Sequence, residues 1–443
     1  MKFGIFYEHQ LPRPWGEGAE LKLFQDALTQ VELADRLGFD CVWEVEHHFL
    51  DEYSHSSAPE VFLAAASQRT RNIRLGHGIR LMPPGYNHPA RVAEGIATLD
   101  LVSGGRVEFG TGESSSLAEL GGFGVEVSAK REQWREALEQ CCHMLALDPY
   151  PGHEGEAFSM PARNVLPKPV QRPHPPLWVA CSNRETIKLA ARLGIGALTF
   201  SFVEPAEARQ WVDDYYRILR EECVPIGHAI NPNIAMVSGF GVHADAEEAL
   251  RRFLPGFLFF GYALGHHYIF GEHVPGRTDI WSAFKQVEAD LANQPGSRRA
   301  IGTPEQVRRH LREMQDAGVD QVILLQQAGN NRHEHICEAL ELFAAEVMGE
   351  FQAGEAEREA RKLEALAPHL DAAMSRRQPI PQLADEDIPT MVALGRQVAE
   401  QGGAGQGDAS AGDTAAANEN ADEKNTAAED SVWKQAEGAR PGG

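Results

Sequence analysis

The chain has 443 residues, a hydrophobic fraction of 43% and a formal net charge of −23 at pH 7. The hydrophobic fraction is ordinary for a globular protein with a sizeable core. Nucleic-acid binding needs a basic surface, so the negative charge argues against that class of partner. No apolar run is long enough to cross a membrane, and the first residues lack a signal-peptide core, so we expect a cytoplasmic protein without a membrane partner.

Short apolar strands alternate with amphipathic helices along residues 1–348. Apolar runs bounded by turn signals predict eight strands, at residues 2–7, 41–46, 73–79, 106–110, 177–180, 196–200, 234–240 and 321–325. Helical spacing is found at about residues 21–37, 58–69, 89–101, 130–147, 185–193, 304–317 and from Asp245 onward. This alternation favours a closed (β/α)8 barrel, the TIM barrel of the α/β class, over an open sheet.

Two stretches interrupt the alternation. Residues 148–176 are rich in proline, and residues 257–297 have no readable periodicity, so we predict irregular insertions in both places. Because loops of a barrel shape its binding site, these insertions should shape the substrate pocket. Their residues do not identify the substrate.

The character of the sequence changes after Met348. Residues 355–374 are charged and alanine-rich with helical spacing, and a short helix is predicted over residues 388–400. We therefore expect a helical extension over residues 349–400. Residues 401–443 hold almost no apolar side chains and cannot bury enough surface to offset the entropy of ordering, so we expect a disordered, solvated acidic tail.

Cysteines and clustered histidines offer no clear metal motif. The six cysteines are scattered, mostly through apolar segments, without the paired spacing of zinc or dithiol sites, and we interpret them as buried thiols. Two histidine clusters, His266-His267 with His273 and His333 with His335, lack the spacing of a helical zinc motif. We therefore favour polar surface roles for both clusters and predict no metal.

The segment 43–49, Trp-Glu-Val-Glu-His-His-Phe, carries the clearest chemistry. It follows a predicted strand, and ligands of α/β folds bind where parallel strands end. Since alternate side chains of extended backbone point to opposite sides, one of His47 and His48 can face the crevice while the other is held in the wall. An imidazole titrates near neutral pH, which suits His47 to proton transfer. A structural histidine flanked by Glu44 and Glu46 is the alternative.

Small and hydroxylated residues follow three further strands. Residues 109–115, Phe-Gly-Thr-Gly-Glu-Ser-Ser, allow backbone amides to approach a ligand closely, but they form neither a Walker loop nor a dinucleotide fingerprint. After the fifth strand, Ser182 or Asn183 opens a helix whose free amides could hold an anion, with plain N-capping as the alternative. Gly78 ends the third strand, where a planar ring could stack on bare backbone or the chain could bend tightly.

Arg131 lies at the start of its predicted helix. A cation there opposes the helix dipole unless an anion is nearby, so we predict that its guanidinium contributes to a phosphate site. In a closed barrel, His47, Gly78, Gly112 and Ser182 would all gather at one mouth.

These motifs together resemble the bacterial luciferase-like flavin monooxygenase family. The resemblance covers residue 1 to about residue 348 and rests on Glu46-His47-His48-Phe49, residues 81–89, residues 99–106, and Trp178-Val179-Ala180 with Ser182 and Thr186. It implies a barrel that binds reduced FMN (FMNH2), usually supplied by a separate flavin reductase. It further implies that a flavin C4a-hydroperoxide, formed with O2, inserts one oxygen atom into a small organic substrate.

The resemblance also implies roles for individual residues. His47 aligns with a histidine that serves catalysis, and Gly78-Ile79 aligns with a non-prolyl cis peptide under the flavin ring. Arg131, Ser182 and Thr186 fall where the family contacts the phosphate. The remaining positions of the expected cofactor site are Gly112, Glu113, Ser114, Asn183 and Phe200.

Three positions depart from the luciferase pattern. Gly112 stands in place of a reactive cysteine, Glu113 in place of an arginine near the phosphate, and Phe200 in place of a tryptophan beside the ring. Glu113 should repel the phosphate unless it turns away, which leaves the anion to Arg131 and neighbouring hydroxyl groups. Light emission is therefore not expected.

The flavin chemistry needs a dry pocket, which we expect Phe6, Trp43 and Phe200 to line. Two other functions stay open. A deazaflavin-dependent oxidoreductase of the same barrel type would transfer hydride without O2, and a non-catalytic flavin-binding subunit would do neither. We also expect a homodimer.

Overall fold

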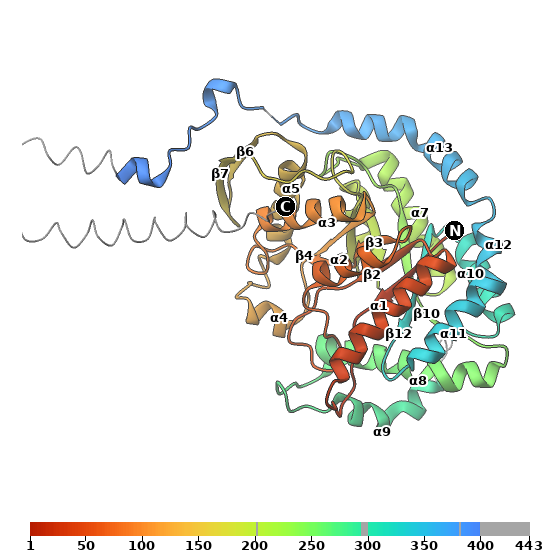
Figure 1. Cartoon of the computed structure of the whole chain (residues 1–443). Helices are drawn as coiled ribbons and strands as arrows, with labels where there is room; N and C mark the ends of the chain where they lie inside the picture. The colour runs from red at the N-terminus through yellow and green to blue at the C-terminus, as the bar shows by residue number, and fades with distance from the viewer. Residues whose placement is uncertain (201–202, 294–299, 381, 399–443) are drawn as a thin grey trace, which may run out of the picture. The chain divides into compact units, whose positions relative to one another are not determined.

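The computed structural model describes residues 1–200, 203–293, 300–380 and 382–398, and it divides the chain into two units, Met1–Ala384 and Asp385–Gly443. Within the first unit, parallel strands pair side by side until the sheet closes on itself (Figure 1). The strands of the ring are β1 (Lys2–Tyr7), β2 (Cys41–Glu44), β3 (Arg74–His77), β5 (Val107–Gly112), β8 (Leu177–Cys181), β9 (Gly196–Thr199), β10 (Ile234–Val242) and β12 (Gln321–Gln327). Pairing of β9 with β10 closes the ring, which confirms the predicted (β/α)8 barrel.

Helices surround the barrel at the predicted places. They are α1 (Ala19–Leu37), α2 (Pro59–Arg69), α3 (Pro89–Ser103), α5 (Lys130–Ala146), α6 (Arg184–Arg192) and α10 (Pro304–Asp316). Two further helices, α7 (Pro205–Glu222) and α11 (His333–Phe343), were not predicted. Local chemistry sets their ends. Thr303 and Gln306 form a capping box that begins α10, and Gly38 ends α1 at φ 88°, a left-handed conformation that suits glycine.

Two buried indoles, Trp43 of β2 and Trp178 of β8, pack against each other in the core. Their rings meet edge to face with centroids 5.4 Å apart, and Trp43 is fully buried. A β-carbon at Gly76 on the neighbouring strand would lie 2.4 Å from the Trp43 ring. The glycine therefore makes room for the indole, and the interior is a packed core rather than a pore.

Both predicted irregular insertions contain regular structure. The first holds an antiparallel hairpin of β6 (Tyr150–Glu154) and β7 (Ser159–Arg163). In the second, helix α8 (Ala246–Gly265) continues into a π-helix, η1 (His266–Phe270), and α9 (Ile280–Ala292) follows. The prediction of irregular structure was wrong there because Pro255 lies inside α8 and apolar side chains occur nearly all round it, which hides helical periodicity.

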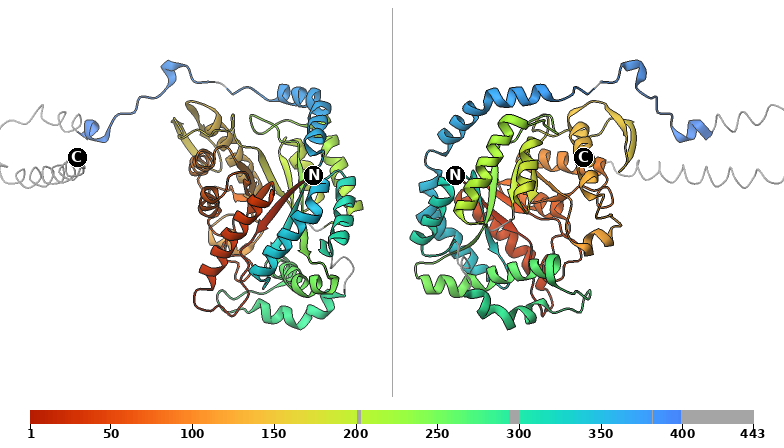
Figure 2. Two further views of the ribbon diagram at one scale, coloured as in Figure 1. Left: turned by 45° about the vertical axis from the view of Figure 1, so that its right-hand side comes forward. Right: turned by 180° about the vertical axis from the view of Figure 1, so that it is seen from behind.

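The segment after the barrel forms α12 (Gly349–Gln352) and α13 (Glu355–Arg376), as the helical spacing predicted. Helix α13 runs along the outside of the unit beside α7 (Figures 1 and 2). Lys362 of α13 lies 3.0 Å from Asp320, the residue before β12, so α13 contacts the end of the barrel where strands begin.

The second unit is described only as far as residue 398. It contains a short 3-10 helix, η3 (Asp385–Asp387), and helical residues 394–398, within the helix predicted over residues 388–400. The predicted tail, residues 401–443, lies outside the described residues. No helix in the described part of the chain is long and apolar enough to span a membrane.

Candidate functional site

The predicted site residues follow the carboxyl ends of the barrel strands. Because all strands of the ring are parallel, these ends lie at the same mouth. In chain order the mouth receives Glu8 after β1, His47 after β2, Gly78 and Ile79 after β3, Glu113 and Ser114 after β5, Ser182 and Asn183 after β8, and Phe200 after β9.

His47 lies at the centre of a hydrogen-bonded cluster. Its Nδ1 is 2.9 Å from Oε1 of Glu119, a fully buried residue of the short helix α4 (Leu117–Gly122). The same Oε1 accepts a bond from the His48 backbone amide at 2.9 Å, and Ser114 Oγ donates to the other oxygen at 2.6 Å. Glu119 is thus held rigidly, and it fixes the position of the His47 ring.

A second carboxylate approaches His47 from β1. Oε2 of Glu8 lies 3.6 Å from His47 Nε2, is buried and has no hydrogen-bond partner in the described structure. The other oxygen of Glu8 accepts a 2.9 Å bond from the Tyr53 hydroxyl. Tyr268 of η1 completes the cluster, with its hydroxyl 3.4 Å from His47 Nδ1. One imidazole therefore stands between two buried carboxyl groups and two phenols.

This arrangement shifts three pKa values. Burial by itself disfavours the charged imidazolium, but Glu119, Glu8 and Glu46 outweigh it and raise the pKa of His47 to about 9. Burial raises the pKa of Glu8 to about 7, although His47 and the Tyr53 hydroxyl oppose the change. Burial also acts to raise the pKa of Glu119, but His47 and the hydrogen bonds to Glu119 reverse the effect and lower it. At neutral pH the cluster holds a charged His47 paired with an ionised Glu119.

His48 points the other way, as the alternation along the strand predicted. Its ring packs in the wall against Phe123 at 4.8 Å, and its Nε2 lies 3.3 Å from Glu46. Glu46 also accepts bonds from the Leu81 amide and the Asn87 side chain. The acidic neighbour of the histidine pair therefore organises the wall.

Aromatic rings line the mouth beneath this cluster. Phe6 and Phe200, two of the predicted pocket residues, lie with centroids 5.3 Å apart, and Phe260 packs on Phe6 at 6.5 Å. The third predicted residue, Trp43, lies deeper, in the barrel core. The floor of the mouth is therefore apolar and suited to exclude water.

Gly112 and Ile79 are in close contact across β4 (Arg80–Leu81) and β5. A β-carbon at Gly112 would lie 2.6 Å from Ile79 Cδ1, which explains the glycine. The cis peptide expected at Gly78-Ile79 is absent, because each cis bond in the described chain precedes a proline. The trans form is the ordinary outcome, since a non-prolyl cis bond costs about 2.5–4 kcal/mol.

Arg131, on α5, forms a two-point ion pair with Glu113, whose carboxylate also lies 3.4 Å from Lys130 Nζ. The hydrogen bonds to Glu113 raise the pKa of Arg131 above its usual value. Glu113 does not turn away from the guanidinium but neutralises it.

Several hydroxyl and amide groups of the expected phosphate site already form hydrogen bonds with other groups of the chain. Asn183 caps α6, and its Oδ1 accepts bonds from the amide and hydroxyl of Thr186 at 3.1 and 3.2 Å. Asn183 therefore caps the helix, and the binding of an anion by its remaining free amides stays a prediction. The Ser114 hydroxyl is committed to Glu119, and Ser182 Oγ lies 3.4 Å from Asn183 Nδ2.

Sequence reasoning missed Glu8, Tyr53, Glu119 and Tyr268. Glu8 follows the first strand directly, so the strand-end rule that identified His47 could also have identified it. Tyr53 lies in the loop after β2, Glu119 on the unpredicted helix α4, and Tyr268 in the stretch read as irregular. No sequence signal assigned these three to the mouth.

The histidine clusters hold no metal site within the described residues. The surface role expected for the first cluster is wrong for His266, which is buried, and burial lowers its pKa. Five of the six cysteines are buried free thiols, as predicted, and Cys337 is half-buried.

The chain is similar in sequence to a family of monooxygenases and to individual monooxygenases. The model of the luciferase-like monooxygenase family matches residues 1–321. The 4-hydroxyprotoasukamycin monooxygenase of Streptomyces nodosus subsp. asukaensis is 31% identical over 215 residues, which are 48% of this chain and 56% of that protein. Limonene 1,2-monooxygenase of Rhodococcus erythropolis is 27% identical over 315 residues, 68% of this chain and 75% of that protein.

Among solved structures, monooxygenase RslO1 from Streptomyces bottropensis superposes with a TM-score of 0.66 and 27% identity, covering 79% of this chain and 100% of its own. The chain spans about half the length of several curated relatives that it matches.

Proposed function

Because the chain belongs to the luciferase-like monooxygenase family, we propose that it is an FMN-dependent monooxygenase that inserts one oxygen atom of O2 into a small organic substrate. The observation that carries the proposal is the position of His47, between Glu8 and Glu119 and above the aromatic floor of the mouth. A protonated histidine next to a pocket that excludes water suits oxygen transfer. The second oxygen atom of O2 leaves as water, and it takes up two protons.

The mouth fits a flavin in two respects. Phe6 and Phe200 offer an apolar surface to a planar ring, and Arg131 offers a guanidinium to the phosphate. The remaining residues proposed to line the FMN site are Gly78, Ile79, Gly112, Glu113, Ser114, Ser182, Asn183 and Thr186, of which Glu113 competes with the phosphate for Arg131. When bound in its reduced form, FMN supplies the two electrons that the reaction needs. We propose that a separate flavin reductase delivers it and that the chain works as a homodimer.

The chain's own residues would handle the protons. His47 carries one proton at Nδ1, facing Glu119, and one at Nε2, facing Glu8. We propose that Nε2 gives its proton to the reacting oxygen while Glu119 holds the ring in place. Glu8 has a pKa of about 7, so it can return a proton to Nε2 between turnovers.

The same geometry favours one alternative, a deazaflavin-dependent oxidoreductase. A charged His47 can donate a proton to a carbonyl oxygen while hydride reaches the carbonyl carbon, and this reaction needs no O2. The third function, a non-catalytic flavin-binding subunit, is disfavoured by the intact cluster around His47.

One experiment separates these functions. The purified chain is mixed with photoreduced FMN or reduced deazaflavin, with and without O2, and with a panel of aldehydes, ketones, terpenes and aromatic compounds. We expect an oxygenated product only with FMN and O2, with one labelled atom from 18O2. Product formed with deazaflavin in the absence of O2 would support the alternative, and absence of turnover with either cofactor would support the subunit.

A further inference from the structure

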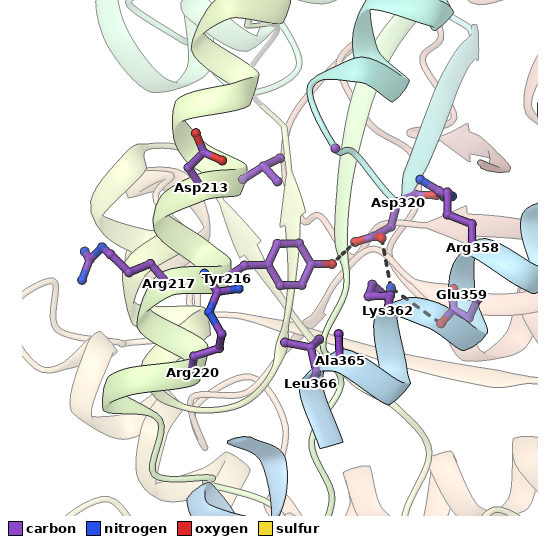
Figure 3. Close-up of a pocket in the computed structure, with 12 residues that line it drawn as sticks. Asp213, Tyr216, Arg217, Arg220, Asp320, Arg358, Glu359, Lys362, Ala365 and Leu366 are labelled. Carbon is purple, nitrogen blue, oxygen red and sulfur yellow. Dashed lines mark hydrogen bonds and ion pairs between the residues drawn. The ribbon is translucent and has the colours of Figure 1, made fainter. Parts of the chain in front are cut away.

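A cavity lies at the end of the barrel opposite the mouth. It has a volume of about 600 Å³ and is bounded by α7, by α13 and by Gly318 and Asp320, which immediately precede β12 (Figure 3). Cavities of this size commonly hold small-molecule ligands. Helix α13 begins well after residue 321, where the match to the family model ends, so one wall of the cavity comes from outside the matched region.

Hydrogen bonds fix the wall on the side of the barrel. Asp320 accepts bonds from the Tyr216 hydroxyl at 2.5 Å, from the Ile234 amide at 2.9 Å and from Lys362 Nζ at 3.0 Å. Arg358 is held by Glu355 at 2.8 Å. These charges neutralise one another, so they form a rigid wall and are not available to a ligand.

The opposite wall carries an unpaired cation. Arg220, in the last turn of α7, lines the cavity, is half-buried and has no hydrogen-bond or ion-pair partner in the described chain. Arg217, one turn earlier, lies 3.2 Å from Glu221 and points away from α13 in Figure 3. The chain carries a net charge of −23, yet no carboxylate of the described residues pairs with this guanidinium.

Three apolar side chains also line the space between the two walls. Val212 of α7 and Leu366 of α13 are buried, with 5% and 4% of their surface exposed, and Ala365 lies beside Leu366 across the cavity from Arg220 (Figure 3). An occupant would therefore meet one unpaired cation at one edge and these apolar side chains beside it.

We propose that this cavity binds a small amphipathic carboxylate, with its carboxyl group on Arg220 and its apolar body between Val212, Ala365 and Leu366. A guanidinium matches a carboxylate in a two-point geometry. A phosphate dianion fits less well, because Asp213 and Glu359 also line the cavity and would repel the second charge. The proposal concerns a site remote from the mouth, so it does not depend on the cofactor used there.

The test is calorimetric titration of the full chain with octanoate, with octanol and inorganic phosphate as separate probes. We expect octanoate to bind with a Kd below about 1 mM and the other two probes to bind at least about tenfold more weakly. Arg220→Gln should weaken octanoate binding about tenfold or more. Ala365→Glu, at an exposed helix position, should abolish it by presenting a carboxylate to Arg220.

The matched control is Arg361→Gln, which removes a cation from the exposed face of the same helix, α13, and should leave binding unchanged. Thermal melting of each variant checks that it is folded. The proposal is overturned if octanoate does not bind, if phosphate binds as tightly as octanoate, or if folded Arg220→Gln and Ala365→Glu variants both bind like the parent.

Discussion

Arg131 donates two hydrogen bonds to Glu113, from Nε to Oε2 at 2.6 Å and from Nη2 to Oε1 at 2.8 Å. The cation proposed to bind the flavin phosphate is therefore already neutralised before any anion arrives. A phosphate must share or displace a carboxylate, and the carboxylate lowers the affinity of the site for anions.

The first prediction concerns this competition. Glu113→Gln should bind FMN about three- to tenfold more tightly, because the guanidinium is released and a negative charge is removed. Arg131→Gln should bind FMN about tenfold more weakly. Riboflavin, which lacks the phosphate, is the control, and its affinity should change little in either variant. Equal changes for FMN and riboflavin in flavin fluorescence titrations would contradict the proposed role.

The second prediction concerns His47. His47→Ala should lower the rate of product formation by roughly 10²-fold or more, the usual scale of acid-base catalysis. His48→Asn is the matched control, since this adjacent imidazole packs in the wall against Phe123. It should keep most of the activity. Unchanged turnover in a folded His47→Ala variant would remove this residue from the mechanism.

The third prediction concerns pH. The folded pKa of His47, about 9, lies above its ordinary value of 6.5, so the imidazolium stabilises the fold fully below pH 6.5 and loses this effect as the pH rises through about 9. Product formation should decline over the same alkaline range. Glu119→Gln should lower the midpoint by about one unit or more, because it removes the carboxylate nearest to Nδ1. Titration of the His47 ring by NMR measures the shift directly, and equal midpoints in parent and variant would refute it.

The fourth prediction concerns the contact of Gly112 with Ile79. Gly112→Ala should lower the free energy of unfolding by about 1–3 kcal/mol, because the new methyl group overlaps the Ile79 side chain. The same substitution should cost less in an Ile79→Ala background, where the overlapping atoms are gone. Urea unfolding of the four proteins of this double-mutant cycle measures the coupling, and additive effects would show that the two residues do not interact.

The barrel was predictable because its strands are short, mainly apolar runs. This pattern can be recognised in the sequence regardless of the length or composition of the loops between the strands. The same pattern predicted that His47 and His48 lie on opposite sides, and the structure assigns His47 to the cluster with Glu119 and His48 to the wall against Phe123. Helix α7 was missed although Trp211, Val212, Tyr215, Ile218 and Leu219 recur at helical spacing and are buried. That periodicity could have predicted it.

The partners of His47 were harder to predict. Glu119 and Tyr268 reach the ring from segments 72 and 221 residues away along the chain. Nothing local distinguishes these side chains from other polar residues, since their role depends on how α4 and η1 fold over the mouth. Glu44 and Glu46, adjacent to the histidines in sequence, make no hydrogen bond to His47 in the described chain. Glu44 accepts one from Ser56, and Glu46 contacts His48 and accepts one from Leu81 of β4. Proximity in sequence was a poor guide to proximity in space.

The Tyr268 hydroxyl ties two properties of the enzyme together. It belongs to the excursion between β10 and β11 (Ala300–Gly302), yet it lies 3.4 Å from the His47 ring, the proposed proton donor. Under the proposed function, remodelling this excursion to admit a new compound would also move a hydroxyl group that contacts the imidazole. We therefore expect substrate range and proton donation to change together, and laboratory evolution of one should be screened for changes in the other.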